Sequence, residues 1–452
     1  MKKIIASFVV LISYSSFAQI VSGPMLGHTD FRTSTVWMQF DQSVKEAALY
    51  YNLNGKNVKR DFAINSGDFK TATATLVGLE PSTTYTYNIV VNNKKDTIAS
   101  GKTTTQTLWQ WREKTTPLPT FSFLAGSCVY VNNPVYDRPG KAYGNDTAIF
   151  DVMAKENASF MLWLGDNWYT REVDYYSEWG LHNRPSSDRA RPFFRNIMKA
   201  MPNYAIWDDH DYGFNDADKS YPLKETSREV FKKFWTNPSY GQNNQGIYSK
   251  FTFNDADVFL LDDRWWRSND EMQDSINGKP NPNKKMYGAA QLDWLKNALL
   301  QSNANQNITF RFIATGSQVL NPVSPFDCFR KFSAEYNELM SFLKENKING
   351  VVFLTGDRHH SEIIKVDREG TYPLIDITAS PLTSGSHKFG GVEKNNPYRL
   401  VGVEDMQNYT KITLKGLKKE RVLQVEIFNP IGEKQANWEI SLKELTTPKA
   451  KD

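Results

Sequence analysis

The fold is set by a short pattern that residues 160–169, FMLWLGDNWY, show most clearly: an apolar run that ends in a glycine and an acidic residue. A short apolar run that stops at a turn signal is typical of a buried strand. The pattern recurs, with further apolar runs at Thr120–Ala125, Asn203–Ile206, Asp257–Leu261, Thr309–Thr315 and Gly350–Thr355. We therefore predict a set of buried strands that lead into polar loops.

Segments with helical spacing lie between several of these strands. Leu292, Leu295 and Leu299 recur at the spacing of one helix face. The predicted helices are Asn145–Glu156, Pro192–Ala200, Ala289–Gln301 and Ser333–Glu345. Alternating strands and helices indicate a layered α/β domain. Because ligands of such folds bind beyond the carboxyl ends of the strands, the polar loops are the predicted site.

Residues 20–104 follow a different pattern and predict an all-β domain. Alternating apolar and polar residues occur at Thr33–Phe40, Glu46–Leu53, Thr71–Leu79 and Tyr85–Val91. The stretch 79–87, LEPSTTYTY, resembles the turn of fibronectin type III domains, in which a corner tyrosine hydrogen-bonds back across the turn. One β-sandwich of this kind is therefore expected ahead of the α/β domain.

The first residues have the composition of an export signal. Met1-Lys2-Lys3 precedes a mostly apolar run, and Ser16-Phe17-Ala18 offers a small-x-small cleavage site. We expect cleavage after Ala18 and export to the periplasm, the cell surface or the medium. The alternative, a membrane anchor, requires a longer apolar run. No later stretch predicts a transmembrane segment.

Composition narrows the range of partners. The formal net charge is +4 over 452 residues, and the charges are spread along the chain. This weak charge argues against a nucleic-acid polymer as the substrate, because such binding depends on many phosphate contacts. Aromatic residues make up 13% of the chain, which excludes a disordered protein.

Four polar motifs follow predicted strands and carry the candidate chemistry. They are Gly126-Ser127-Cys128, Gly165-Asp166-Asn167-Trp168-Tyr169, Trp207-Asp208-Asp209-His210-Asp211 and Gly356-Asp357-Arg358-His359-His360. Any one of them alone is more often a turn or a packed residue. Together they supply thiolate and phenolate donors, which suit a high-affinity metal such as iron, and carboxylates, which suit calcium, magnesium or manganese. Two adjacent cations activate water and stabilise a phosphoryl transition state.

With these motifs the region from about Phe121 to Leu382 resembles the PhoD-type alkaline phosphatases, a branch of the calcineurin-like metallophosphoesterases related to purple acid phosphatases. Two further motifs share the resemblance, Leu261-Asp262-Asp263-Arg264 and Thr378-Ala379-Ser380-Pro381. The resemblance implies an α/β fold, a four-layer α/β/β/α sandwich behind an all-β Ig or fibronectin III-like domain. The expected organisation is a signal peptide (1–18), the β-sandwich (19–105), a linker (106–119), the phosphoesterase domain (120–446) and a tail (447–452).

The resemblance also implies the cofactors and the ligands. Fe³⁺ would be held by Cys128, Asp166, Tyr169 and His359. Asp166 would bridge to one or two Ca²⁺, with Asp209 and Asp357 as further ligands. His210 would act on the phosphate as a catalytic residue. The expected reaction is hydrolysis of a small phosphate mono- or diester by metal-activated hydroxide at neutral to alkaline pH.

Several roles stay open at the level of sequence. Arg264 is a catalytic candidate that either clamps a phosphate or pairs with a neighbouring carboxylate. No histidine lies between His210 and His359, and Gln318 is the best-placed substitute ligand. Cys128 is either a metal ligand, which we prefer, or the partner of Cys328 in a disulfide.

Two further alternatives concern the substrate and the class of protein. Four tryptophans either stack on an aromatic or nucleoside leaving group or belong to the core: Trp168, Trp207, Trp265 and Trp266. The alternative function is an exported surface- or carbohydrate-binding protein with structural calcium only. A structural calcium site has no use for a thiolate or a phenolate, so Cys128 and Tyr169 distinguish the two functions. The N-terminus also lacks the Arg-Arg pair that this family often uses for export.

Overall fold

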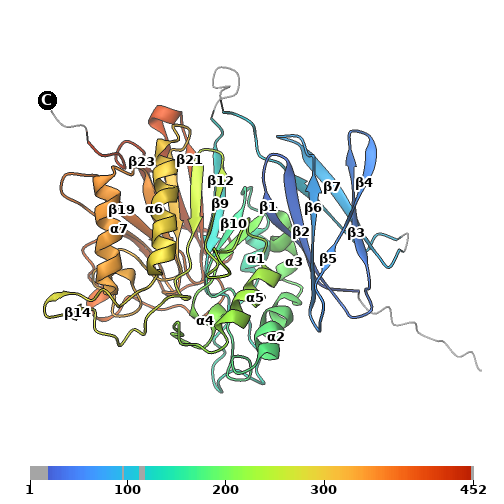
Figure 1. Ribbon diagram of the computed structural model, residues 1–452, viewed down its shortest axis with the longest axis horizontal. Coiled ribbons are helices and arrows are strands. Elements are labelled where there is room, and N and C mark those ends of the chain that lie inside the picture. Colours follow the sequence, from blue (N-terminus) through green and yellow to red (C-terminus); the bar gives the residue numbers. More distant parts are fainter. Residues whose placement is uncertain (1–18, 94–95, 111–117, 449–452) are drawn as a thin grey trace, which may run out of the picture.

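The computed structural model describes residues 19–93, 96–110 and 118–448 (Figure 1). The predicted signal peptide, residues 1–18, lies outside the described residues, as do 111–117 of the predicted linker and the last four residues of the predicted tail. At the start of the linker, Gln106 donates to the carbonyl oxygens of Thr29 and Thr252, and Trp109 is fully buried. The described part of the linker is therefore packed against both neighbours.

The N-terminal domain is a sandwich of two four-stranded antiparallel sheets. One sheet has the order β1-β2-β6-β5 and the other β4-β3-β7-β8. The strands are β1 (Ile20–Thr29), β2 (Thr33–Phe40), β3 (Ala47–Leu53), β4 (Lys56–Asp61), β5 (Ala63–Ile64), β6 (Lys70–Val77), β7 (Thr84–Val91) and β8 (Ala99–Thr104). The Glu80 backbone N–H donates to the Tyr85 hydroxyl at 2.8 Å, so the predicted corner tyrosine is present.

The second domain is built on two larger sheets. The six-stranded sheet has the order β11-β10-β9-β21-β22-β23. Its strands are β9 (Phe121–Gly126), β10 (Met161–Leu164), β11 (Asn203–Ile206), β21 (Tyr409–Lys415), β22 (Val422–Phe428) and β23 (Lys434–Ser441). Strands β9, β10 and β11 are parallel, so their carboxyl ends lie at one edge.

The seven-stranded sheet has the order β12-β13-β16-β17-β19-β18-β20. Its strands are β12 (Ser249–Phe253), β13 (Ala256–Leu260), β16 (Phe310–Ala314), β17 (Val351–Thr355), β18 (Ser361–Val366), β19 (Leu374–Thr378) and β20 (Arg399–Val403). Strands β13, β16, β17 and β19 are parallel. A short hairpin, β14 (Ser275–Ile276) and β15 (Lys279–Pro280), lies outside both sheets.

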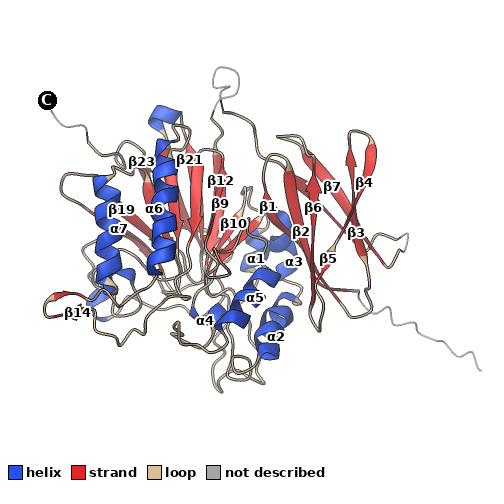
Figure 2. Cartoon of the chain, in the orientation of Figure 1, coloured by secondary structure: helices blue, strands red, loops and turns tan. Residues whose placement is uncertain are grey.

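Helices cover the outer faces of both sheets (Figure 2). Beside the seven-stranded sheet lie α6 (Gly288–Ala304) and α7 (Ser333–Glu345). Beside the six-stranded sheet lie α1 (Ile149–Met153), α2 (Glu178–Arg189), α3 (Phe194–Ala200), α4 (Asp209–Tyr212) and α5 (Lys224–Phe234). Three short 3₁₀ turns complete the domain: η1 (Phe329–Lys331), η2 (Gly391–Glu393) and η3 (Lys418–Glu420).

Alternation along β10 explains the four layers. Leu162 and Leu164 pack into the core between the two sheets, whereas Met161 and Trp163 pack into the core under α1, α3 and α5. A strand that is buried on both faces reads as a continuous apolar run, which is why the sequence pattern marks it so clearly. The predicted α/β/β/α order is therefore present.

The sandwich packs directly on the helical layer of the second domain, between the blue and green parts of Figure 1. Met25 of β1 and Trp37 of β2 belong to the same buried cluster as α3 and α5. The Trp37 indole N–H donates to the Lys233 carbonyl at 2.7 Å, and the Asn203 amide donates to Leu26 O at 3.1 Å. Two residues of the sandwich therefore pack into a core of the second domain, while the sandwich keeps a core of its own. Across the described ranges, no helix has the length and apolar character required to span a bilayer.

Candidate metal centre

Four polar loops meet where β9, β10, β11 and β17 end. Cys128 follows β9, and its sulfur lies 3.6 Å from an oxygen of Asp166, in the loop after β10. The same sulfur lies 3.6 Å from the backbone oxygen of Asp357, in the loop after β17. The backbone N–H of His210, after β11, is 3.4 Å from Asp166 Oδ1. Motifs that are far apart in the sequence thus converge on Asp166.

The backbone is strained at these positions. Cys128, Asp166, Asp357 and His359 have φ angles of 61°, 51°, 66° and 56°. Residues other than glycine rarely adopt this left-handed region, which costs free energy and clusters at functional sites. Four of the six predicted ligands are therefore held in conformations that local preference does not explain.

Glycines let the loops approach one another closely. A side chain at Gly165, where φ is 89°, would place its Cβ 2.7 Å from the Cβ of Asp208. A side chain at Gly356 would place its Cβ 2.4 Å from the carbonyl oxygen of Leu164. The glycine that precedes each aspartate is thus required for packing between loops.

A first set of donors suits a metal that favours anionic ligands. Sulfur, oxygen and nitrogen atoms of Cys128, Asp166 and His359 lie within 4.8 Å of one another. The Tyr169 hydroxyl lies 3.2 Å from His359 Nε2. His359 Nδ1 lies 2.6 Å from the Gly385 carbonyl oxygen, to which a protonated Nδ1 donates, leaving the Nε2 lone pair directed at the cluster.

A second set of donors shares Asp166 with the first. Atoms of Asp166, Asp209 and His210 also lie within 4.8 Å of one another. Asp209 accepts a hydrogen bond from the Asp216 backbone N–H at 2.8 Å. Asp357 lines the same surface cavity as Asp166 and Asp209. The arrangement offers two adjacent positions for cations, with one carboxylate common to both.

The pKa values of these groups indicate whether the site suits a cation. Burial, together with the nearby charge of Asp357, raises the pKa of Cys128 to about 11. Burial and neighbouring anions also raise the pKa values of Asp166 and Tyr169 well above their usual ranges. Buried acidic groups that lie close together repel one another when they are ionised. A bound cation stabilises their ionised forms. The donor set therefore fits a metal.

A cavity of about 1010 Å³ opens beside these groups. It is lined by Asp166, Asp209, His210, Asp357 and His359 together with surface loops. The His210 ring lies 4.1 Å from that of Tyr169, and its Nδ1 has no hydrogen-bond partner. Burial lowers the pKa of His210, so its ring is neutral at neutral pH. His210 is therefore a neutral imidazole at the lining of the cavity.

Arg264 makes the second of the two contacts predicted for it. Its guanidinium pairs with Asp208 and, at 3.1 Å, with Asp327, and lies 3.9 Å from Asp209. The side chain is 1% exposed, and Arg264 is not among the residues that line the cavity. Its contacts position carboxylates behind the centre instead of reaching into the cavity.

Gln318 and the four candidate tryptophans lie outside the centre, and Cys128 is free to act as a ligand. The Gln318 amide donates to Glu362 and Thr378, and its oxygen accepts from Asn321, so Gln318 is engaged elsewhere. Cys128 and Cys328 are both free thiols, which excludes the disulfide alternative. Three of the four tryptophans are buried and the fourth is packed against the core, and none of them lines the cavity: Trp168, Trp207, Trp265 and Trp266.

Sequence reasoning missed the residues that hold the ligands in place. The Ser380 hydroxyl lies 3.2 Å from Cys128 Sγ and accepts from the His359 backbone N–H at 3.0 Å. Ser384 and Tyr143 each lie 3.1 Å from His359 Nδ1, and His387 stacks on His359 at 4.8 Å. The motif Thr378-Ala379-Ser380-Pro381 was the available signal for Ser380. The others come from two loops that show no sequence pattern, one with Tyr143 and one with Ser384 and His387.

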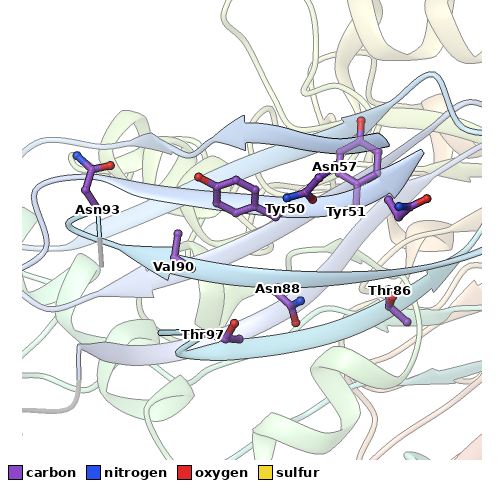
Figure 3. Close-up of a pocket in the computed structure, with 9 residues that line it drawn as sticks. Tyr50, Tyr51, Asn57, Thr86, Asn88, Val90, Asn93 and Thr97 are labelled. Carbon is purple, nitrogen blue, oxygen red and sulfur yellow. The ribbon is translucent and has the colours of Figure 1, made fainter. Parts of the chain in front are cut away.

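A second hollow, of about 570 Å³, lies on the outer sheet of the sandwich (Figure 3). Tyr50 and Tyr51 of β3, Asn57 of β4 and Thr86 and Asn88 of β7 contribute to it. Among the described residues that line it, none is acidic, basic, a histidine or a cysteine. Those residues therefore offer no carboxylate, imidazole or thiolate ligand.

Comparison with known proteins agrees with this geometry. A model of the PhoD-like phosphatase family matches residues 139–420, and a domain of unknown function, DUF7800, matches residues 17–108. Alkaline phosphatase D of Bacillus subtilis (strain 168) is 25% identical over 394 residues, which is 75% of this chain. This chain spans 63% of the length of that relative.

A solved structure of PhoD shares the architecture. It matches with a TM-score of 0.71 at 18% sequence identity and covers 93% of both chains. The match confirms the predicted fold, with the sandwich ahead of the layered domain. Since the family model alone covers more than half of the sequence, the chain belongs to the PhoD-like phosphatase family.

Proposed function

We propose that this protein is an exported, metal-dependent phosphoesterase that hydrolyses small phosphate mono- or diesters. The proposal rests on one observation: two sets of metal-ligand donors share Asp166, which lines the large cavity. A shared carboxylate between adjacent cations is an arrangement that supports phosphoryl chemistry. Membership of the PhoD-like phosphatase family supports the same reaction class.

The residues of each set suit different cations. Cys128, Asp166, Tyr169 and His359 would hold Fe³⁺, because thiolate and phenolate are strong anionic donors. Asp166, Asp209 and Asp357 would hold one or two Ca²⁺, because calcium prefers carboxylate oxygens. Two such cations, when bound, supply Lewis-acid activation of water and neutralise charge on the phosphoryl group.

Three side chains of the protein have proposed roles beside the cations: Asp209, His210 and Arg264. Asp209 is kept ionised: burial alone would raise its pKa, but the charge of Arg264 and the hydrogen bond from the Asp216 backbone N–H hold that pKa below the usual range. His210 lines the cavity, where a ring N–H would donate to a phosphate oxygen or to the leaving group. Arg264 keeps Asp208 and Asp327 in place from behind.

Export and domain division complete the proposal. The sequence of residues 1–18 supports cleavage after Ala18. The sandwich (19–105), the linker (106–119), the catalytic domain (120–446) and the tail (447–452) are proposed as the units of the chain. The spread, weak net charge supports a small ester as the substrate over a nucleic-acid polymer.

The alternative is a surface- or carbohydrate-binding protein with structural calcium. The uncharged hollow on the sandwich is the feature that favours it, since aromatic and amide side chains suit neutral sugars. That function leaves the buried thiol of Cys128 and the phenol of Tyr169 without a role.

Hydrolysis of p-nitrophenyl phosphate and bis(p-nitrophenyl) phosphate by chelator-free protein separates the two functions. We expect turnover that a chelator abolishes and that added metals restore, and the better substrate assigns the ester class. Absence of turnover of both esters by the metal-loaded protein would overturn the proposal in favour of the binding function.

A further inference from the structure

One side of the cavity carries an apolar rim that the proposed hydrolysis of a bare phosphate does not require. Phe326 and Val392 both line the cavity and are 63% and 66% exposed. Exposed apolar side chains that line a cavity can pack against the organic part of a ligand. A phosphate group occupies only a small part of about 1010 Å³. The rim is therefore available to the organic part of a substrate.

The Phe326 ring is held in place by Arg358, which contacts one of its faces. The Arg358 guanidinium carbon lies 4.6 Å from the ring centroid, so the cation stacks on one face of the ring. Arg358 itself is buried and donates to Glu393 at 2.7 Å. Glu393 also accepts from the Asn321 amide at 3.1 Å. This chain of contacts fixes the orientation of the exposed ring.

Phe326 is connected to the candidate metal centre in two ways. Arg358, on which the ring rests, stands between Asp357 and His359, two of the predicted ligands. Asp327, the next residue along the chain, pairs with Arg264, which lies 3.9 Å from Asp209. A group attached to a phosphate at the centre therefore has the ring of Phe326 within the same cavity.

We propose that Phe326, stacked on Arg358, is a specificity-determining residue that binds a flat aromatic or heteroaromatic ring in the ester group of the substrate. The inference rests on the proposed function, because it assigns the substrate class of that same site. Aromatic pairs stabilise a flat ring beyond simple apolar burial. The sequence left open whether four tryptophans stack on an aromatic leaving group, and we assign this stacking to Phe326 instead.

Three non-hydrolysable phosphonates test the proposal as competitive inhibitors of whichever chromogenic ester the holoenzyme cleaves. Methylphosphonate has no ring, cyclohexylphosphonate has an apolar but puckered ring, and phenylphosphonate has a flat one. We expect the inhibition constant of phenylphosphonate to be about five- to ten-fold lower than that of the other two.

The variants Phe326→Leu and Phe326→Ala should bring that ratio to within about two-fold. Since Phe326 is exposed, both variants should fold. Leu417→Ala, at a residue that is 67% exposed and does not line the cavity, is the matched control and should keep the wild-type ratio. A wild-type protein without preference for phenylphosphonate, or variants that retain the preference, would overturn the inference.

Failure of the proposed function gives a different result. In that case no ester is cleaved, and calorimetric titration of the metal-loaded protein with the same phosphonates replaces inhibition. Binding of phenylphosphonate that depends on Phe326 would still support the subsite, and equal binding of all three would still remove it.

Discussion

At the scale of single residues, the account depends on Asp166. Its carboxylate belongs to both donor sets, its φ is 51°, and burial together with neighbouring anions raises its pKa. A carboxyl group that is strained, buried and surrounded by acids is costly in the absence of a cation. The same reasoning applies to Cys128, whose thiol is fully buried beside it.

Replacement of Cys128 by serine tests the predicted iron ligand. Serine keeps the shape but removes the thiolate, so we expect loss of visible charge-transfer absorption and of iron content, and a fall in kcat/KM of at least ~100-fold. Cys328→Ser is the matched control, because the Cys328 thiol is also buried but hydrogen-bonds to the backbone carbonyl oxygens of Val319 and Asn321. A C128S protein with full iron content and colour would remove Cys128 from the ligand set.

Ser380→Ala tests the support behind the ligands. Its hydroxyl contacts Cys128 and receives the His359 N–H, so we expect metal affinity and activity to fall by about 10- to 100-fold. The melting temperature of the metal-free protein should change by only a few degrees, since two hydrogen bonds of one hydroxyl are lost. Ser220→Ala, at an exposed position, serves as the control. Unchanged affinity in S380A would show that the contacts do not tune the metal.

At the scale of elements, a buried network ties strand β18 to η2 and β20. Glu362 of β18 accepts from Arg399 of β20 at 2.7 Å and from Gln318 at 2.7 Å. Asn321 links this network to Glu393 of η2, which holds Arg358. The loop that carries the candidate ligands is thus anchored by hydrogen bonds from three elements.

The network predicts a pH dependence of stability. Burial alone would raise the pKa of Glu362, but its contacts with His360, Gln318 and Arg399 outweigh burial and lower the pKa to about 2. Because the pKa is depressed on folding, ionised Glu362 stabilises the fold above pH ~4.5, and this contribution is lost as the pH falls toward 2. Glu362→Gln should therefore lower the free energy of unfolding at neutral pH by about 3 kcal/mol.

Denaturant unfolding of wild type and E362Q from pH 7 to pH 2 checks this prediction. The difference between the two proteins should shrink as the pH falls through this window. A difference that stays constant with pH would show that Glu362 acts through packing alone.

Sequence patterns located some elements well and others poorly, for physical reasons. Strands β9, β10, β11 and β17 are buried on both faces, so their apolar runs are unbroken. Helix α2 was missed because Pro185 interrupts it and polar residues fill most of its length. The helix predicted at Asn145–Glu156 shortens to Ile149–Met153. Local propensity is weakest where tertiary contacts decide the outcome.

The candidate site shows the same division. Residues that follow strand ends in short motifs, such as Cys128, Asp166 and His359, were predicted and lie together. Ser384 and Tyr143, which contact His359, come from long loops whose path depends on packing between both sheets. No sequence periodicity encodes that path.

At the scale of the whole molecule, the two domains share a buried interface. Trp37 of the sandwich is 1% exposed and packs against Phe234 of α5 at 5.8 Å between ring centroids. Arg189 of α2 stacks on the Trp235 ring at 4.0 Å in the same interface. Because the interface is buried and apolar, we expect the sandwich and the catalytic domain to unfold together.

Trp37→Ala tests this coupling. The substitution leaves a cavity between the domains and should cost about 3–5 kcal/mol, with one calorimetric transition at a lower temperature. Ile431→Ala, at a residue that is 71% exposed, should leave the transition unchanged. A new early transition for the sandwich alone, with the remaining transition unaltered, would show that the domains are independent.

The most direct test of the central claim is metal analysis with a visible spectrum of protein purified without chelator. The shared position of Asp166 predicts iron and calcium in the same molecule, with a charge-transfer band from Cys128 or Tyr169. Removal of the metals should abolish the band and ester hydrolysis together. Calcium alone, with no absorption band and no hydrolysis of either chromogenic ester, would contradict the account.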